Sequence, residues 1–126
     1  MKLLLDTQSL LWWINDDPKL NQVKRELIAD PANTVLVSAV SFWEIAIKHR
    51  IGKMEDTGSG VMRAVQDSRF QIVEIEPEHL QQLESFVSHP KHKDPFDHLI
   101  LAQAVVRQAV LVTSDAALRT YGARCL

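Results

Sequence analysis

Lys2-Leu3-Leu4-Leu5-Asp6 joins three consecutive leucines to a carboxylate. An uninterrupted apolar run of this length is typical of a central strand buried on both faces of a parallel sheet. The following residues, Ser9 to Ile14, indicate a helix. Ligand sites in open parallel sheets lie beyond the carboxyl ends of the strands, so we expect Asp6 at the mouth of a site. The alternative is that Asp6 only caps the following helix.

Further strands and helices alternate along the rest of the chain, which is the rhythm of an α/β fold. Asp17 and Pro18 predict a helix start, and Gly52 a helix end. The expected strands are 34–37, 70–75 at an edge, 110–113 and a short last one at 123–126. The expected helices are 18–28, 40–50, 61–68, 77–87, 94–109 and a short one at 114–121.

The composition predicts one globular domain over residues 1–126. The chain is 46% hydrophobic and 24% charged, and its net charge of −2 excludes the strongly basic profile of a general nucleic-acid binder. Cys125 is the only cysteine, so no intrachain disulfide can form, which favours a cytoplasmic protein. The first residues predict neither a signal peptide nor a membrane span.

Acidic residues fall where this fold would bring them together. Asp6 and Asp115 follow two strands of the predicted parallel sheet, and Glu44 lies inside the helix after the second strand. Asp94 and Asp97 begin the long apolar helix. Carboxylates that share one cleft repel each other unless a cation is present, and oxygen ligands select Mg²⁺ or Mn²⁺. Such ions activate phosphate groups and water, so the pattern indicates metal-assisted hydrolysis of a phosphodiester.

Each acid also has a purely structural interpretation. Asp94 before Pro95 is a typical N-cap, and Asp97 would be the acid of the same first turn. Glu44 and Lys48 have the spacing of a helical surface ion pair, although the residues around Glu44 are strongly apolar. Asp115 can cap the short helix that follows it.

Four motifs, in order, resemble the PIN-domain toxins of the VapC type, and together they span nearly the whole chain. They are Leu4-Leu5-Asp6-Thr7, the stretch from Val37 to Lys48 that contains Phe42-Trp43-Glu44, the stretch from His92 to Ala104 that contains Asp94-Pro95-Phe96-Asp97, and Leu111-Val112-Thr113-Ser114-Asp115.

The resemblance implies a three-layer PIN-like fold, with a parallel sheet in the order 3-2-1-4-5 between helices. It implies an endoribonuclease that uses Mg²⁺ or Mn²⁺, possesses a cognate antitoxin partner, forms a homodimer and acts on RNA, with transfer RNA as a plausible substrate. The implied metal-binding and catalytic acids are Asp6, Glu44, Asp97 and Asp115. Thr113, Ser38 and Asp94 would support them, with Asp94 first of all a cap. Many relatives have His in place of Gln8 and Arg in place of His98, which affects substrate contacts rather than metal binding.

Basic and aromatic residues suggest contact surfaces. Lys48, Lys91, Lys93 and His98 are candidates for RNA contact, because basic side chains near the site can hold phosphates without reading sequence. The alternative for the loop around Lys91 is a solvated basic segment. The histidines match no structural zinc pattern. In the pairs Trp12-Trp13 and Phe42-Trp43, adjacent residues point about 100° apart on a helix, so one of each pair can be exposed at a dimer or partner interface.

Two other functions compete with the ribonuclease. A haloacid-type phosphatase would also place an aspartate after a central strand, but it expects an acid at position 8, where this chain has Gln8. A non-catalytic RNA-binding or adaptor module on the same fold would be expected to have lost acids, and all of them are present.

Overall fold

The computed structural model describes residues 1–86 and 94–126 of the chain. Within these residues, helices and strands alternate as the sequence predicts, and a 3₁₀ helix (η1) follows the last strand. The elements are β1 (Lys2–Leu5), α1 (Thr7–Ile14), α2 (Gln22–Ala29), β2 (Thr34–Ser38), α3 (Ala39–Arg50), α4 (Gly58–Asp67), β3 (Gln71–Val73), α5 (Pro77–Glu84), α6 (Pro95–Arg107), β4 (Val110–Val112) and η1 (Ala116–Tyr121).

The strands form a parallel sheet in the order β3-β2-β1-β4, with β1 at its centre. Leu4 pairs with Leu36 on one side and with Leu111 on the other. The predicted α/β class and the order 3-2-1-4 are therefore confirmed. The last strand expected at 123–126 is present only as a single parallel bridge between Cys125 and Leu111, so the sheet has four strands within the described residues. The carbonyls of Arg124 and Leu126 nevertheless accept hydrogen bonds from the amides of Leu111 and Thr113, so this segment lies beside β4.

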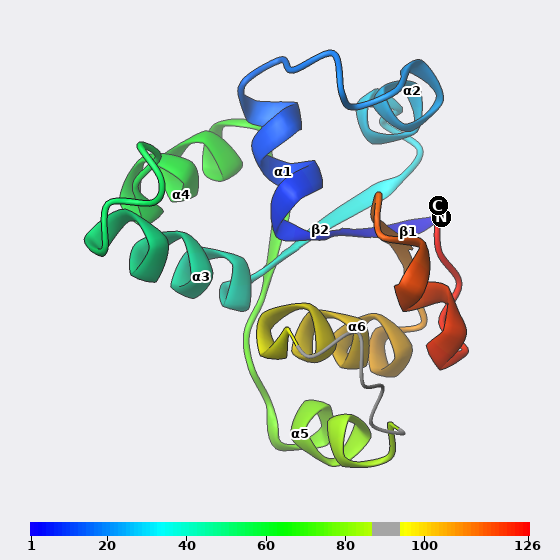
Figure 1. Cartoon of the computed structure of the whole chain (residues 1–126). Coiled ribbons are helices and arrows are strands. Elements are labelled where there is room, and N and C mark those ends of the chain that lie inside the picture. Colours follow the sequence, from blue (N-terminus) through cyan, green and yellow to red (C-terminus); the bar gives the residue numbers. More distant parts are fainter. Residues whose placement is uncertain (87–93) are drawn as a thin grey trace.

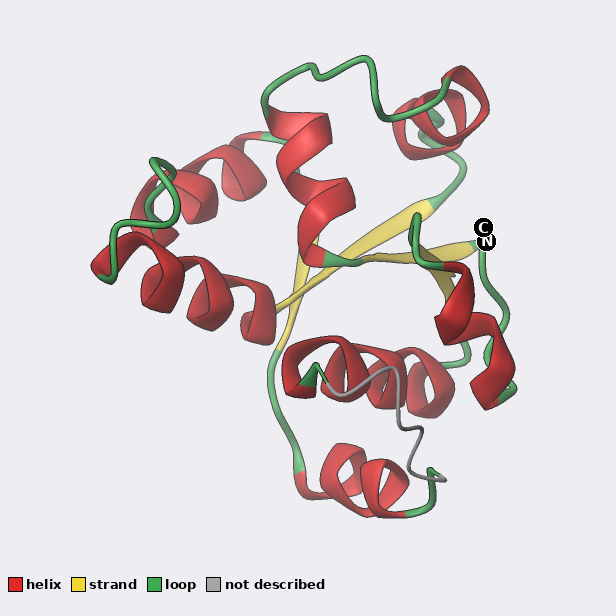
Figure 2. Ribbon diagram, viewed as in Figure 1, coloured by secondary structure: helices red, strands yellow, loops and turns green. Residues whose placement is uncertain are grey.

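Helices cover both faces of the sheet (Figures 1 and 2). Leu3 and Leu5 point into one core, together with residues of α1, α2, α3 and α4. Leu4 points into the other core, which is built largely from α6 and the apolar residues around it. All three leucines are fully buried, so the apolar run of β1 serves both cores and requires a strand covered on both faces.

Several predicted helix boundaries differ from the structure, and the helix predicted at 61–68 begins at Gly58, after the N-cap Thr57. The second helix begins at Gln22 rather than Pro18, because the side chain of Asn21 accepts a hydrogen bond from the Lys24 amide and caps it. Asp17 instead accepts a hydrogen bond from the Lys19 amide in the preceding turn. The helix predicted at 77–87 ends at Glu84.

No helix within the described residues is both long enough and apolar enough to cross a membrane.

Candidate active site

Asp6 lies at the carboxyl edge of the sheet, directly after β1. Its amide donates to the carbonyl of Val112 at 3.1 Å, which holds the ends of β1 and β4 together. Its carboxylate accepts the Ser9 amide at 2.7 Å and so caps α1. The capping interpretation of Asp6 is therefore confirmed, and the same carboxylate also lines a cleft at this edge.

Glu44 reaches the same edge from the middle of α3. It is 4% exposed, so its carboxylate is almost completely buried. One carboxylate oxygen, Oε2, accepts a hydrogen bond from Lys48 Nζ at 2.5 Å. The other, Oε1, is buried and has no hydrogen-bond partner among the described residues. The predicted pair with Lys48 exists, but it is a partly buried pair rather than a solvated surface one.

The remaining acids come from α6 and from the start of η1. Asp94 is the N-cap of α6, and its Oδ1 accepts the amides of Phe96 and Asp97 at 2.9 and 3.2 Å. Asp97 lies in the first turn of the same helix. Asp115 caps η1 by accepting the Ala117 amide at 3.0 Å. Capping and a place in the cleft are thus compatible for these residues.

The acids meet in one cleft of about 190 Å³ at the carboxyl edge. Within the described residues its walls come from α1, α3, the start of α6 and the segment after β4. The lining residues are Asp6, Thr7, Gln8, Leu11, Glu44, Lys48, Met54, Asp94, Asp97, Ser114 and Asp115. The structure therefore brings together the principal acids predicted from the sequence.

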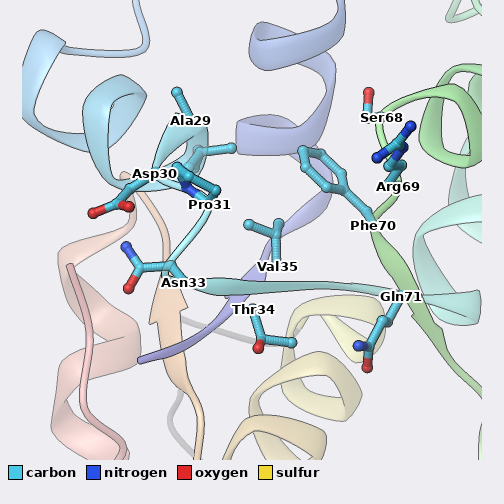
Figure 3. Close-up of a pocket in the computed structure, with 11 residues that line it drawn as sticks. Ala29, Asp30, Pro31, Asn33, Thr34, Val35, Ser68, Arg69, Phe70 and Gln71 are labelled. Atoms are coloured by element: carbon cyan, nitrogen blue, oxygen red, sulfur yellow. The ribbon is translucent and has the colours of Figure 1, made fainter.

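A larger cavity, of about 370 Å³, lies at the opposite edge, where β2 and β3 begin (Figure 3). Val35 and Phe70 are among its apolar lining, and Asp30 and Arg69 stand at different sides of it. It has none of the convergent carboxylates of the smaller cleft. We therefore place the candidate chemistry in the smaller cleft, where the ends of the strands, the helix caps and the acids coincide.

The environment of Asp6 opposes its ionisation. Burial raises the pKa of the Asp6 carboxyl above its ordinary value, while hydrogen bonds from Thr113 and Ser9 and the charge of Lys24 lower it in part. Lys24, on α2, donates to the Thr113 carbonyl at 2.8 Å. Neither Ser9 nor Lys24 was predicted from the sequence to support the site. The N-cap pattern after Asp6 points to the Ser9 amide, whereas Lys24 lies 89 residues from Thr113 and carries no sequence signal for this contact.

The predicted supporting residues divide into two groups. Thr113 is buried against the site, and its hydroxyl also accepts the Asp115 amide at 3.0 Å. Ser38 does not line the cleft. Its fully buried hydroxyl caps α3 and donates to the side chain of Gln103, which is a structural role.

Of the residues predicted to contact RNA, one lines the cleft and the others do not or lie outside the described residues. Lys48 lines the cleft, but its ammonium is engaged by Glu44. His98 lies outside the lining, and its ring is 5.3 Å from that of Tyr121. Lys91 and Lys93 lie outside the described residues.

The donor set fits a hard divalent cation by its chemistry, although the described side chains are not arranged around one point. No three acids, histidines or cysteines in residues 1–86 and 94–126 are positioned to hold a single ion. The carboxylate oxygens are nevertheless the ligand type that Mg²⁺ and Mn²⁺ prefer. The unpartnered Oε1 of Glu44 is a buried acceptor at the cleft, and a buried acceptor without a hydrogen-bond partner is costly unless a cation or donor meets it.

The family model of the PIN domain matches residues 3–123. The chain therefore belongs to the PIN domain family, as its motifs predict. No curated protein sequence matches the chain significantly.

Solved structures with the same fold include chains of toxin–antitoxin complexes. VapBC from Salmonella typhimurium, solved bound to DNA, has a TM-score of 0.72 at 16% identity, covering 100% of this chain and 97% of the other. VapBC2 from Rickettsia felis, bound to a promoter DNA fragment, has a TM-score of 0.70 at 18% identity, covering 100% and 98%. VapBC-1 from nontypeable Haemophilus influenzae has a TM-score of 0.70 at 17% identity, covering 100% and 97%.

Proposed function

We propose that the chain is a single-domain toxin of the VapC type, a Mg²⁺- or Mn²⁺-dependent endoribonuclease. The observation that carries the proposal is the convergence of Asp6, Glu44, Asp97 and Asp115 from four parts of the chain into one cleft. Membership of the PIN family and likeness to VapBC chains support this assignment.

In this proposal the four acids hold the cation. A bound cation at such a site supplies charge stabilisation for the scissile phosphate and lowers the pKa of a water molecule. The chain's own residues prepare the ligands. The Ser9 amide and the Thr113 side chain hold the Asp6 carboxylate by hydrogen bonds, and β1 and α1 fix its position. Asp94 keeps the first turn of α6, and with it Asp97, in place.

The substrate in this proposal is RNA, and transfer RNA is a candidate. Lys91, Lys93 and His98 remain candidates for contact with its phosphates. The cleft is open at the edge of the sheet and is lined by polar side chains such as Gln8 and Ser114, which suits a backbone segment better than a small apolar ligand.

The proposed partners are a cognate antitoxin and a second copy of the chain. Trp43 is 51% exposed on α3, and its ring packs edge-on against Phe96 of α6 at 4.8 Å. Both helices also contribute acids to the cleft, so an antitoxin that covers this aromatic pair would lie beside the site. Exposed aromatic residues are enriched at interfaces.

A cleavage assay tests the function. Purified protein should cleave transfer RNA with Mg²⁺ or Mn²⁺ and lose the activity in chelator. Binding of RNA without cleavage in either metal would favour the adaptor module. Hydrolysis of a small phosphate ester without cleavage of RNA would favour the phosphatase, although the exposed Gln8 stands where that chemistry expects an acid.

A further inference from the structure

Lys48 is the one cationic side chain among the described residues that line the cleft, facing five carboxylates. It lies one helical turn after Glu44 on α3. Its Nζ is 2.5 Å from Glu44 Oε2, and the two side chains are 38% and 6% exposed. A pair in which the acid is this deeply buried is more consequential than a solvated surface pair.

The charges of several acids favour the ionised form of Lys48, and Glu44 contacts its ammonium directly. The hydrogen bond to Glu44 raises the pKa of Lys48 above its ordinary value, against the opposing effect of burial, and the charges of Asp94 and Asp97 add to the increase. The positive charge of Lys48 is therefore stabilised by carboxylates on both α3 and α6. These include two of the proposed metal ligands, Glu44 and Asp97.

Glu44 is nevertheless only half satisfied. Lys48 occupies Oε2, while Oε1 is buried without a partner among the described residues. In this arrangement Lys48 leaves Oε1 without a partner, so we expect the buried carboxylate to favour a more highly charged cation.

We propose that Lys48 is the internal counter-ion of the metal-free cleft and competes with the divalent cation for Glu44. This inference rests on the proposed function. When the divalent cation binds Glu44, it displaces the Lys48 ammonium from the carboxylate or is repelled by the positive charge of Lys48. Lys48 therefore lowers the metal affinity of the cleft, while it stabilises the metal-free protein. The released ammonium then stands at the mouth of the cleft, where it can meet a substrate phosphate.

Calorimetric titration with Mn²⁺ alone tests this without measuring cleavage. Lys48→Gln removes the charge and keeps a hydrogen-bond donor for Glu44. We expect it to bind Mn²⁺ about tenfold more tightly than wild type, the scale of one nearby charge at a partly exposed site. Lys48→Arg keeps the charge and should bind no more tightly than wild type. Lys19→Gln, at an exposed lysine in the α1–α2 connection, should bind as wild type does.

Thermal unfolding provides the second measurement. In chelator Lys48→Gln should melt below wild type, because Glu44 loses its counter-ion, and Mn²⁺ should raise its melting temperature by more than it raises that of wild type. Lys48→Arg should melt close to wild type in chelator and so provides a folded variant if Lys48→Gln does not fold.

Equal or weaker Mn²⁺ binding by Lys48→Gln, an unchanged melting temperature in chelator, or tighter binding by Lys48→Arg would overturn the inference. The proposed function fails separately: wild-type protein that binds no Mn²⁺ at all contradicts the metal site itself. Wild type that binds Mn²⁺ and cleaves RNA, with a Lys48→Gln variant of equal affinity, leaves the ribonuclease intact and removes only the role of Lys48.

Discussion

At the scale of single residues, Asp6 has two roles that make opposite demands. As the cap of α1 it must accept a hydrogen bond from the Ser9 amide, and as a proposed metal ligand it must be ionised. Burial opposes the ionised form and raises the pKa of Asp6 above its ordinary value of 3.8. In the metal-free protein the charge on Asp6 therefore lowers the free energy of unfolding, and we attribute this destabilisation to the functional role of the residue.

The first prediction follows from the direction of this pKa shift. Because the folded protein holds the Asp6 proton to a higher pH than the unfolded chain does, the free energy of unfolding falls as pH rises from about 3.8 through the raised pKa. Asp6→Asn keeps a capping acceptor and removes this cost. In chelator the variant should melt above wild type at pH 7 and equal to it at pH 3. A variant that melts lower at pH 7 would show that the charge stabilises the fold.

A second prediction separates the cap from the site at Asp94. Because Asp94 accepts two amides of the first turn, Asp94→Ala should lower the free energy of unfolding by about 1 kcal/mol, and Asp94→Asn by much less. Urea denaturation measures both. If Asp94 is only a cap, Asp94→Asn should also cleave RNA at the wild-type rate. A large loss of cleavage with unchanged stability would place Asp94 in the site instead.

At the scale of elements, helix caps and strand ends do most of the positioning. β1 and β4 end together, so Asp6 and Thr113 emerge at one edge, while α3 and α6 bring Glu44 and Asp97 to it from the side. α2 contributes through Lys24, whose ammonium donates to the Thr113 carbonyl and lowers the pKa of Asp6 by its charge.

The third prediction concerns this contact. Lys24→Met should lower the free energy of unfolding by about 1–2 kcal/mol, because it removes a charge-assisted hydrogen bond to a carbonyl whose residue is buried. Lys19→Met, at an exposed lysine in the preceding turn, is the matched control and should unfold as wild type does. If the two variants were equally stable, the contact between Lys24 and Thr113 would not stabilise the fold, and α2 would not support the site.

Most of the helices and strands could be predicted from the sequence, because their signals are local. The apolar run of β1, the β-branched β2 and the Asp94-Pro95 start of α6 are local signals that the tertiary structure reinforces. The start of α2 was predicted wrongly because Asp17-Pro18 and Asn21 are both good start signals, and only packing selects between them. The pair between Glu44 and Lys48 was predicted, but its burial was not, because the spacing alone cannot distinguish a solvated pair from a buried one.

At the scale of the whole molecule, the sheet separates two regions of different character. The carboxyl edge gathers the acids and lies beside the exposed Trp43, whereas the larger cavity at the other edge has mixed, non-convergent lining. A toxin must be held inactive until it is needed, so a surface next to the cleft is where a blocking partner would be most effective.

The fourth prediction concerns that partner. Expression of the chain should arrest growth, and co-expression of the antitoxin from the adjacent gene should restore it. Trp43→Ser should weaken antitoxin binding at least about tenfold, because exposed aromatic anchors carry much of the binding energy at interfaces. Val23→Ser, which changes a 65% exposed residue on α2, is the control and should bind as wild type does. Equal binding by both variants would move the antitoxin away from this surface.

The most direct test of the central claim is the rate of RNA cleavage by Asp6→Asn in saturating Mn²⁺. If the four acids hold the catalytic cation as a unit, the rate should fall at least about 10²-fold while the melting temperature in chelator shows an intact fold. A folded Asp6→Asn protein that cleaves RNA at the wild-type rate would contradict the assignment of the cleft as the active site.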